Sequence, residues 1–160
     1  MISFPEIRRQ DRLLAPGQIE FLLNTGEYGV LSMCAANGYG YGVPLSFARD
    51  GEKLYFHCAP EGFKLQNLAA NNQASFCIVG RTQVLPEKFS TGYESVVVFG
   101  KVTQQLPDDE RRAALRLLIR KYCHDQVTSG EKYIEAAFHR TQVLRLDIEH
   151  CSGKSRKFEP

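Results

Sequence analysis

The sequence predicts a mainly β protein, a small antiparallel barrel with peripheral α-helices, and two observations support this prediction. First, apolar and aromatic residues gather into about six short segments with strand character. Second, most of these segments follow one another through turn residues such as Asn37-Gly38 and Asp50-Gly51, with no helix between them. Strands joined in this way pair antiparallel, so a doubly wound parallel sheet is not expected.

Size and composition indicate a single domain over residues 1–160. The chain has 160 residues, of which 43% are hydrophobic, so it can bury a proper core. Its net charge of +2 is too small to predict nucleic-acid binding. No apolar segment has the length of a signal peptide or a membrane span, so we expect a cytoplasmic protein without a membrane partner.

The cysteines do not predict a metal site. There are five of them, scattered, and no CxxC pair occurs. Three stand next to a histidine in the sequence, but neighbouring residues on a strand point to opposite faces and rarely ligate one ion together. We therefore expect no metal, and the thiols are interpreted as small buried hydrophobes.

Up to Cys58, the chain is predicted to hold one helix and three strands. A helix begins at Pro16-Gly17-Gln18 and ends at Gly26, because its apolar residues recur with helical spacing between a proline start and a glycine stop. The expected strands are Gly29–Ala35, Tyr41–Arg49 and Leu54–Cys58.

The Tyr41–Arg49 strand is bulky on one face and bare on the other. The small face carries Gly42, Pro44, Ser46 and Ala48. Such a face leaves room for a flat molecule against the backbone, and the alternative is tight packing from a neighbouring barrel strand. Because Pro44 cannot donate a ladder hydrogen bond, the strand should be an edge strand, bulged or interrupted.

A helix that starts without a cap is predicted directly after the Leu54–Cys58 strand. Pro60 suits the first helical position, and the helix should end at Asn71-Asn72. No capping side chain stands ahead of Pro60, so the first N–H groups and the positive dipole end are free for an anion. Lys64 in the first turn favours a phosphate site. The alternative is a water-capped helix with a solvated lysine.

The second half of the chain is predicted to alternate strands and helices. The expected elements are a strand over 74–79 that ends at Gly80, a loop over 81–90, a strand over 93–102, a helix from Pro107, a weaker helix over 131–139, a strand over 142–149 and a basic end. Gly100 in the 93–102 strand would permit a bulge or a close backbone approach. Gly153-Lys154-Ser155 in that basic end lacks the glycine spacing of a phosphate-binding P-loop, and no nucleophile elbow occurs.

Four segments together resemble a known family. In order they are Glu27-Tyr28-Gly29-Val30-Leu31-Ser32, Val43-Pro44-Leu45-Ser46-Phe47, Tyr55-Phe56-His57-Cys58-Ala59-Pro60-Glu61-Gly62-Phe63-Lys64 and Ser95-Val96-Val97-Val98-Phe99-Gly100. The chain resembles the nitroimidazole-resistance branch of the pyridoxamine 5'-phosphate oxidase-like flavin-binding split-barrel proteins, over Arg12 to Lys157. The resemblance implies a six-stranded antiparallel split β-barrel and a homodimer with FMN at the subunit interface.

The resemblance also implies roles for particular residues. Lys64 is expected to contact the FMN phosphate, with the Gly62 and Phe63 backbone nearby. His57 is expected on the flavin or substrate side as the candidate catalytic residue. The remaining cofactor-binding positions are Val43, Pro44, Leu45 and Ser46, which border the isoalloxazine, and Ser95 and Val97. The last two are expected to approach the cofactor either from the same chain or from the partner chain.

One departure speaks against vitamin B6 oxidation. The oxidases proper carry an Arg-Lys pair where this chain has Phe63-Lys64, and their basic residues for the substrate phosphate are not found. We therefore expect a reductase that takes a hydride from NAD(P)H and passes electrons to a small aromatic nitro compound or quinone, with His57 as proton donor. The alternatives are a non-catalytic flavin-binding carrier or sensor, and a split barrel that holds haem with His57 as a ligand.

Overall fold

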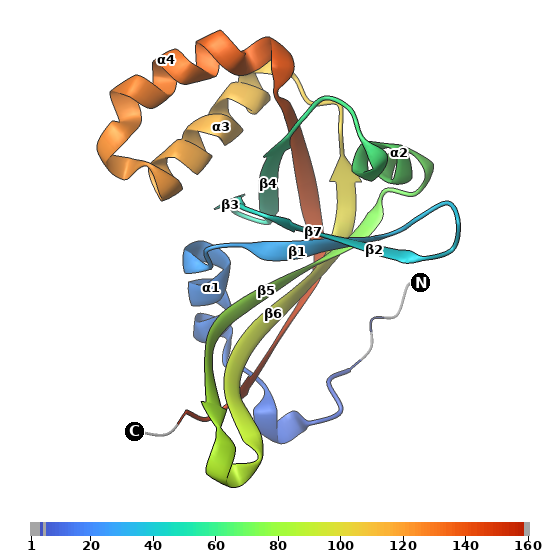
Figure 1. Cartoon of the computed structure of the whole chain (residues 1–160), viewed down its shortest axis with the longest axis vertical. Helices are drawn as coiled ribbons and strands as arrows, with labels where there is room; N and C mark the ends of the chain where they lie inside the picture. The colour runs from blue at the N-terminus through green and yellow to red at the C-terminus, as the bar shows by residue number, and fades with distance from the viewer. Residues whose placement is uncertain (1–3, 5, 159–160) are drawn as a thin grey trace.

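The computed structural model describes residue 4 and residues 6–158. Within them, seven strands form one sheet in the order β2-β1-β5-β6-β7-β4-β3, and every neighbouring pair is antiparallel. The sheet curls strongly, and the helices lie at its outside and at its end (Figure 1). The prediction of an antiparallel split barrel is confirmed, with seven strands where six were expected. No helix of the described part is long and apolar enough to cross a membrane.

The elements have the following bounds. The strands are β1 (Gly29–Cys34), β2 (Gly40–Leu45), β3 (Ala48–Asp50), β4 (Lys53–Cys58), β5 (Gln73–Leu85), β6 (Ser90–Thr103) and β7 (Gln142–Arg156). The α-helices are α1 (Pro16–Thr25), α2 (Phe63–Ala70), α3 (Asp108–Tyr122) and α4 (Val127–Ala137). Short 3₁₀ helices lie at η1 (Gln10–Arg12), η2 (Pro86–Lys88), η3 (His124–Gln126) and η4 (Phe138–Arg140).

The seventh strand arises because the predicted Tyr41–Arg49 strand breaks in two. Strands β2 and β3 are the two opposite edges of the sheet, yet only Ser46 and Phe47 separate them in the sequence. Two residues span a few ångströms, so the sheet must curl until its edges meet. We call Ser46 and Phe47 the corner. The expectation that Pro44 marks an edge strand is confirmed, since β2 pairs with β1 alone among the described strands.

Phe47 points from the corner into the barrel and organises its core. Its ring is fully buried and packs edge-on against Phe76, with ring centroids 5.1 Å apart, and Phe76 in turn packs against Phe56 at 4.8 Å. Helix α1 closes one end of the barrel with Leu22 and Leu23. Around these side chains lie the inward residues of the strands, among them Leu31, Leu54, Ile78, Val96, Val98, Leu144 and Leu146.

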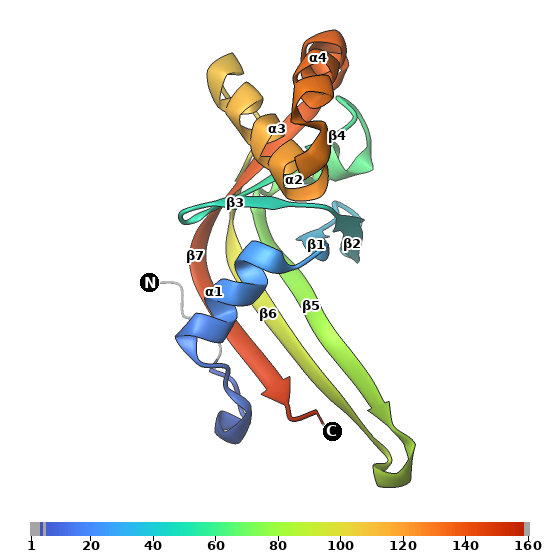
Figure 2. The same cartoon turned by 90° about the vertical axis from the view of Figure 1, so that its left-hand side faces the viewer.

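The outer surface of the barrel is covered on one half only. Helices α3 and α4 pack over β3, β4 and β7 and bury a second cluster that includes Ala48, Tyr55 and Val143 (Figure 2). No described helix covers the outer face of β2, β1, β5 and β6. Its residues include Ser32, Ser75, Cys77, Ser95 and Val97, which are half-buried.

Three predicted boundaries are wrong. Pro60 lies in a bend, and α2 begins at Phe63 after Gly62, whose φ of 132° sets the turn into the helix. Gly80 does not end its strand: β5 continues to Leu85 and pairs with β6 in a long hairpin, so the expected loop over 81–90 is mostly strand. A Cβ at Gly80 would lie 2.6 Å from Leu22 and from Glu94, so this glycine serves close packing.

The last strand is likewise longer than predicted. Strand β7 runs past Glu149 to Arg156, because its basic end pairs with β6 from Val96 to Tyr93. Gly153 of this end lies against Leu14 and Ile19 inside the barrel, which excludes a phosphate loop there. Of the two alternatives at Gly100, a bulge and a close backbone approach, the structure shows both: the β6–β7 register shifts between Phe99 and Gly100, and a Cβ at Gly100 would clash with the Asp147 carbonyl.

The end of α3 fastens the corner. The Tyr122 hydroxyl accepts a hydrogen bond from the Phe47 N–H (3.0 Å), and the carbonyl oxygens of Glu27 (2.6 Å) and Phe47 (3.0 Å) both lie within its donor distance. Lys121 Nζ donates to the Phe47 carbonyl at 2.9 Å and lies 3.6 Å from the Phe47 ring centroid. Burial lowers the pKa of Lys121 to about 8. Two neighbouring side chains thus hold the backbone at the point where the sheet edges meet.

Removing the Tyr122 hydroxyl should therefore weaken the barrel. We expect Tyr122→Phe to lower the free energy of unfolding by about 1–3 kcal/mol, because it leaves partly buried backbone groups at the corner without a partner. Urea denaturation measures this loss. Tyr39→Phe is the matched control, since Tyr39 is 75% exposed in the β1–β2 turn. Equal stability of the two variants would contradict the role given to Tyr122.

Candidate functional site

The predicted site residues fall into two groups in the structure. Pro44, Leu45, Ser46 and His57 line two recesses that meet at the corner. The start of α2 adjoins them, since Lys64 lies near His57 and Phe63 packs against Tyr41 of β2. Ser95 and Val97 lie on the uncovered outer face of β6. The structure therefore assembles most of the predicted site but leaves two residues apart from it.

The start of α2 has the free backbone donors that the sequence predicted. The helix has no side-chain cap, and its N-cap residue Gly62 has φ 132° and ψ 169°, a conformation essentially restricted to glycine. A Cβ at Gly62 would meet nothing within 4 Å, so the backbone there faces open space. The amides of Phe63 and Lys64 belong to the first turn and have no acceptor within the helix. An anion placed here would meet these donors and the positive end of the helix dipole.

Lys64 brings a positive charge from this turn to the end of β4. Its ammonium group hydrogen-bonds the Cys58 thiol and lies close enough to His57 to influence the imidazole electrostatically. Burial is the main cause that lowers the pKa of His57 below its ordinary 6.5, and the Lys64 charge is the second. The imidazole is therefore mostly neutral at pH 7. The pKa of Cys58 is raised by burial, against the effect of Lys64.

The small-residue face predicted for the 41–49 segment lies mainly on the edge strand β2. Gly42, Pro44 and Ser46 are exposed, while Val43 and Leu45 on the other face are half-buried against the core. Ala48, predicted on the same small face, is instead buried under α3, because the corner turns the chain before it. Phe63 packs edge-on against Tyr41 with ring centroids 5.0 Å apart, which ties the start of α2 to this strand.

A cleft of about 410 Å³ opens between β4 and the α3–α4 hairpin, and Ser46 and His57 both line it. We call it the α3–α4 cleft. Its other lining residues are Leu115, Leu118, Ile119, Tyr122, Cys123, Tyr133, Ile134, Ala137 and Thr141. A smaller hollow of about 290 Å³ on the β2 side shares Ser46 and Tyr122 with it. The corner thus separates two recesses: the mainly apolar α3–α4 cleft on one side, and the smaller hollow beside Pro44 and Leu45 on the other.

Sequence reasoning missed the α3–α4 cleft. The apolar periodicity of α3 predicts a buried face, but it cannot tell a filled interface from one that leaves a gap. Tyr133 and Thr141 carried no signal, because nothing in the sequence places α4 opposite His57. Only the structure brings these distant segments together.

Ser95 and Val97 are not part of this region in the same chain. Along the uncovered face, Pro44 pairs with Val30, Val30 with Cys77, and Cys77 with Val97. Three strand spacings separate Pro44 from Val97, roughly 14 Å along the sheet. Neither Ser95 nor Val97 lines the α3–α4 cleft or the smaller hollow.

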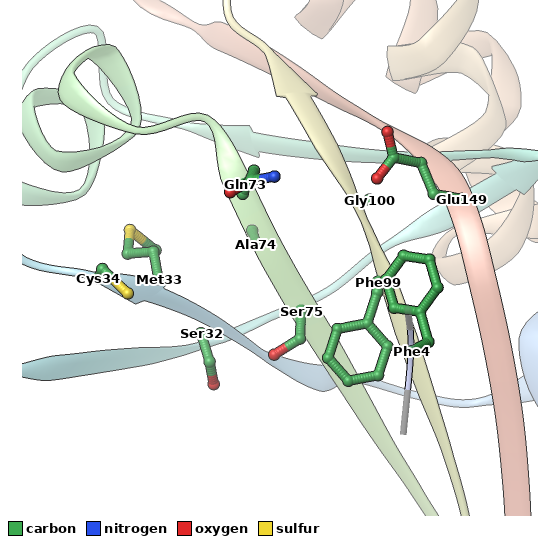
Figure 3. Close-up of a pocket in the computed structure, with 10 residues that line it drawn as sticks. All are labelled: Phe4, Ser32, Met33, Cys34, Gln73, Ala74, Ser75, Phe99, Gly100 and Glu149. Atoms are coloured by element: carbon green, nitrogen blue, oxygen red, sulfur yellow. The ribbon is translucent and has the colours of Figure 1, made fainter. Parts of the chain in front are cut away.

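Another hollow, of about 380 Å³, lies on the uncovered face and contains none of the predicted residues (Figure 3). Phe4 and Phe99 line it from one side, with ring centroids 5.4 Å apart, and Phe4 also stacks on His150 at 4.8 Å. Ser32 and Ser75 come from β1 and β5, and the Glu149 carboxylate, which pairs with Lys101, lies above the rings. Within the described residues, no group of three or more His, Cys, Asp and Glu side chains could hold a metal ion.

Comparison with known proteins identifies relatives of the whole domain. A family model described as pyridoxamine 5'-phosphate oxidase matches residues 16–155. The chain is similar to the crystal structure of a proposed 5-nitroimidazole antibiotic resistance protein from Bacteroides thetaiotaomicron, with 25% identity and a TM-score of 0.77 over 90% of this chain and 86% of that one. No curated protein matches.

Two further structures share the fold. A FAD-binding protein from Mesorhizobium loti is 26% identical, with a TM-score of 0.63 over 91% of this chain and 98% of that one. A FAD and haem binding protein from Mycobacterium smegmatis is 21% identical, with a TM-score of 0.77 over 91% of this chain and 73% of that one. At this identity the last comparison supports the fold alone.

Proposed function

Because this chain belongs to the pyridoxamine 5'-phosphate oxidase family, we propose that it binds flavin mononucleotide beside the corner and reduces small aromatic acceptors with electrons from NAD(P)H. The observation that carries the proposal is the juxtaposition of Lys64, on an uncapped helix start, with His57 and the bare edge of β2. The FAD-binding protein from Mesorhizobium loti supports a flavin as the class of cofactor.

The start of α2 would hold the cofactor phosphate. The free amides of Phe63 and Lys64 point to the N-terminal side of the helix, the Gly62 backbone is accessible, and the Lys64 ammonium is the only lysine charge of this turn. Charge-assisted hydrogen bonds of this kind are roughly twice as strong as neutral ones. The amides of one helix turn can bind one phosphate group, which favours FMN, with a single phosphate, over FAD, with two.

The edge of β2 would hold the flavin ring. Its exposed Gly42 and Pro44 leave the backbone of residues 43–46 open to a flat ring, and the Ser46 hydroxyl stands at the end of this wall. The bound cofactor supplies the redox chemistry, a two-electron exchange between the nicotinamide donor and the acceptor. The protein contributes the position of the ring and a wall that shields one of its faces.

His57 would deliver the proton that the reduced acceptor takes up. It lines the α3–α4 cleft, where an acceptor can lie, and its lowered pKa means that only a minor fraction is protonated at pH 7. A proton donor of this kind works better as the pH falls toward its pKa.

A second copy of the chain would complete the flavin site. Val97 lies three strand spacings, roughly 14 Å along the sheet, from Pro44, and neither Ser95 nor Val97 lines the recesses beside the corner. In a homodimer whose uncovered outer faces meet, these residues of one protomer can approach the corner of the other. The bare small-residue surface of β1, β5 and β6 suits such an interface.

Vitamin B6 oxidation is not the function we propose. Phe63 stands where the oxidases carry an arginine, and no lysine or arginine is among the described residues that line the α3–α4 cleft to receive a substrate phosphate. The Bacteroides relative, which is named for 5-nitroimidazole resistance, supports a small nitroaromatic acceptor instead. The cytoplasm remains the predicted location.

Loss of the Lys64 charge should weaken FMN binding. We expect Lys64→Ala to raise the Kd for FMN by roughly ten- to a hundredfold, since it removes one charge-assisted contact. Fluorescence titration of the apoprotein with FMN measures this change, and FAD titrated in parallel tests the preference for one phosphate. Lys132→Ala on the exposed surface of α4 is the control. Protein that takes up no flavin, or that shows an intense Soret band when purified, would refute the proposal in favour of an empty or haem-binding barrel.

The shared site predicts complementation between two defective chains. Lys64→Ala and Val97→Phe should each weaken FMN binding at both sites of a homodimer that carries the single variant. A mixed dimer of the two variants should recover one intact site, because the Lys64 of one chain and the Val97 of the other then stay native. Absence of flavin from isolated mixed dimers that have formed would place both residues in the same chain's site.

Turnover should depend on His57 and on pH. We expect anaerobic oxidation of NADH or NADPH to be stimulated by a nitroimidazole or a quinone. The kcat for acceptor reduction should rise as the pH falls from 8 to 6, because the protonated fraction of His57 grows toward its lowered pKa. His57→Gln should show a lower kcat that lacks this rise, while FMN affinity is retained. Tight FMN binding without stimulated oxidation by either donor would indicate a flavin carrier or sensor.

A further inference from the structure

We propose that the α3–α4 cleft is a binding site for an uncharged, planar molecule of about two fused rings, whose polar group lies against His57 and Ser46. Its use as the acceptor site rests on the proposed function, whereas the binding itself does not require flavin. The flavin site determines neither this location nor the absence of charge in the ligand.

The lining of the cleft selects against charge. Its eleven described residues include no lysine, arginine, aspartate or glutamate, and the one histidine has a lowered pKa that keeps it mostly neutral at pH 7. Lys64 acts on His57 electrostatically, but it does not line the cleft and hydrogen-bonds the Cys58 thiol. A charged ligand would therefore lose its hydration without an ion pair from the lining, which is unfavourable in apolar surroundings. The volume of about 410 Å³ lies within the range of about 300–1,000 Å³ typical of small-molecule sites.

The polar groups of the cleft are gathered at one end. The Thr141 hydroxyl donates to the Ala137 carbonyl at 2.9 Å, and the Tyr122 hydroxyl is already engaged at the corner. On the barrel side of the cleft a ligand would therefore meet His57 and the Ser46 hydroxyl, which also hydrogen-bonds Tyr122. The Tyr133 side chain lies on the α4 side and is largely exposed. The α-helical sides offer apolar surfaces such as Leu118 and Ile134. A flat ligand with a carbonyl or nitro group at one end matches this arrangement.

The cleft is kept open by contacts on its outer side. Gly130 of α4 approaches Ile119 of α3 so closely that a Cβ there would lie 2.6 Å from Ile119. Arg116 pairs with Glu131 at 2.8 Å, and the Arg112 guanidinium lies 3.9 Å from the Phe138 ring centroid while it also pairs with Glu135. These contacts fix α4 against α3, so the gap toward His57 does not depend on a ligand to form.

Fluorescence of a single tryptophan can test the site without flavin, because the chain contains no tryptophan. Tyr133 lines the cleft and is 66% exposed, so Tyr133→Trp should fold and place the probe at the mouth. The ligand pair is 2,3-dimethyl-1,4-naphthoquinone, which is uncharged and cannot add to the Cys123 thiol, and 2-hydroxy-3-methyl-1,4-naphthoquinone, which is an anion of the same shape at pH 7.5. Tyr39→Trp in the β1–β2 turn is the control for non-specific quenching.

We expect the uncharged quinone to quench Tyr133→Trp apoprotein saturably, the anion to bind roughly tenfold more weakly or worse, and Tyr39→Trp to show no saturation. Adding Cys123→Phe, which fills the mouth, should abolish the saturable quenching, whereas adding Val127→Phe outside the cleft should not. Equal binding of both quinones, or quenching that survives Cys123→Phe, would overturn the inference. Protein that binds the quinone but no flavin would refute the proposed function and still support the cleft site. Flavin uptake without saturable quenching would refute the cleft site and still support the proposed function.

Discussion

The hold of Tyr122 and Lys121 on the Phe47 backbone is the contact on which the architecture depends. Antiparallel pairing alone gives a seven-stranded sheet with two free edges. Those edges are joined through Ser46 and Phe47, and α3 clamps that joint with a tyrosine hydroxyl and a half-buried ammonium group. Phe47 then fills the barrel on one side, and Ser46 faces the recesses on the other. The contacts that close the barrel at the corner therefore also position the candidate site.

The α3–α4 hairpin divides the barrel surface into two chemically different halves. Where it covers β3, β4 and β7, it buries Tyr55 and Val143 and leaves an uncharged cleft beside His57. Where no described helix covers the sheet, small residues such as Ser75 and Cys77 form an open surface. In the proposed function, the first half receives a small substrate and the second half contacts another copy of the chain. The proposed flavin site lies at the border, where the edge of β2 meets the start of α2.

Local sequence signals predicted the parts of the fold that local chemistry determines. The α1 boundaries, the edge character given by Pro44 and the bulge at Gly100 all follow from backbone properties of proline and glycine. The free start of α2 was predicted from the lack of a capping residue, although the helix begins at Phe63 because Gly62, and not Pro60, sets the turn. Gly80 misled the prediction, since a glycine that ends a strand and one that admits Leu22 look the same in sequence.

Features that depend on distant segments could not be predicted in this way. The break of the 41–49 segment at the corner requires α3, which follows about 60 residues later and supplies Tyr122. The α3–α4 cleft requires His57 and Tyr133 to face each other across the fold. The resemblance supplied Ser95 and Val97, which line neither recess at the corner; in the proposed homodimer they would reach the flavin from the partner chain.

The most direct test of the central claim is a crystal structure of the protein grown with excess FMN. The account predicts the phosphate on the amides of Phe63 and Lys64, the ring along residues 43–46, and Ser95 and Val97 of a partner protomer on the far side of the ring. A flavin bound instead in the hollow beside Phe4 and Phe99, or a start of α2 without phosphate in a flavin-loaded protein, would contradict it.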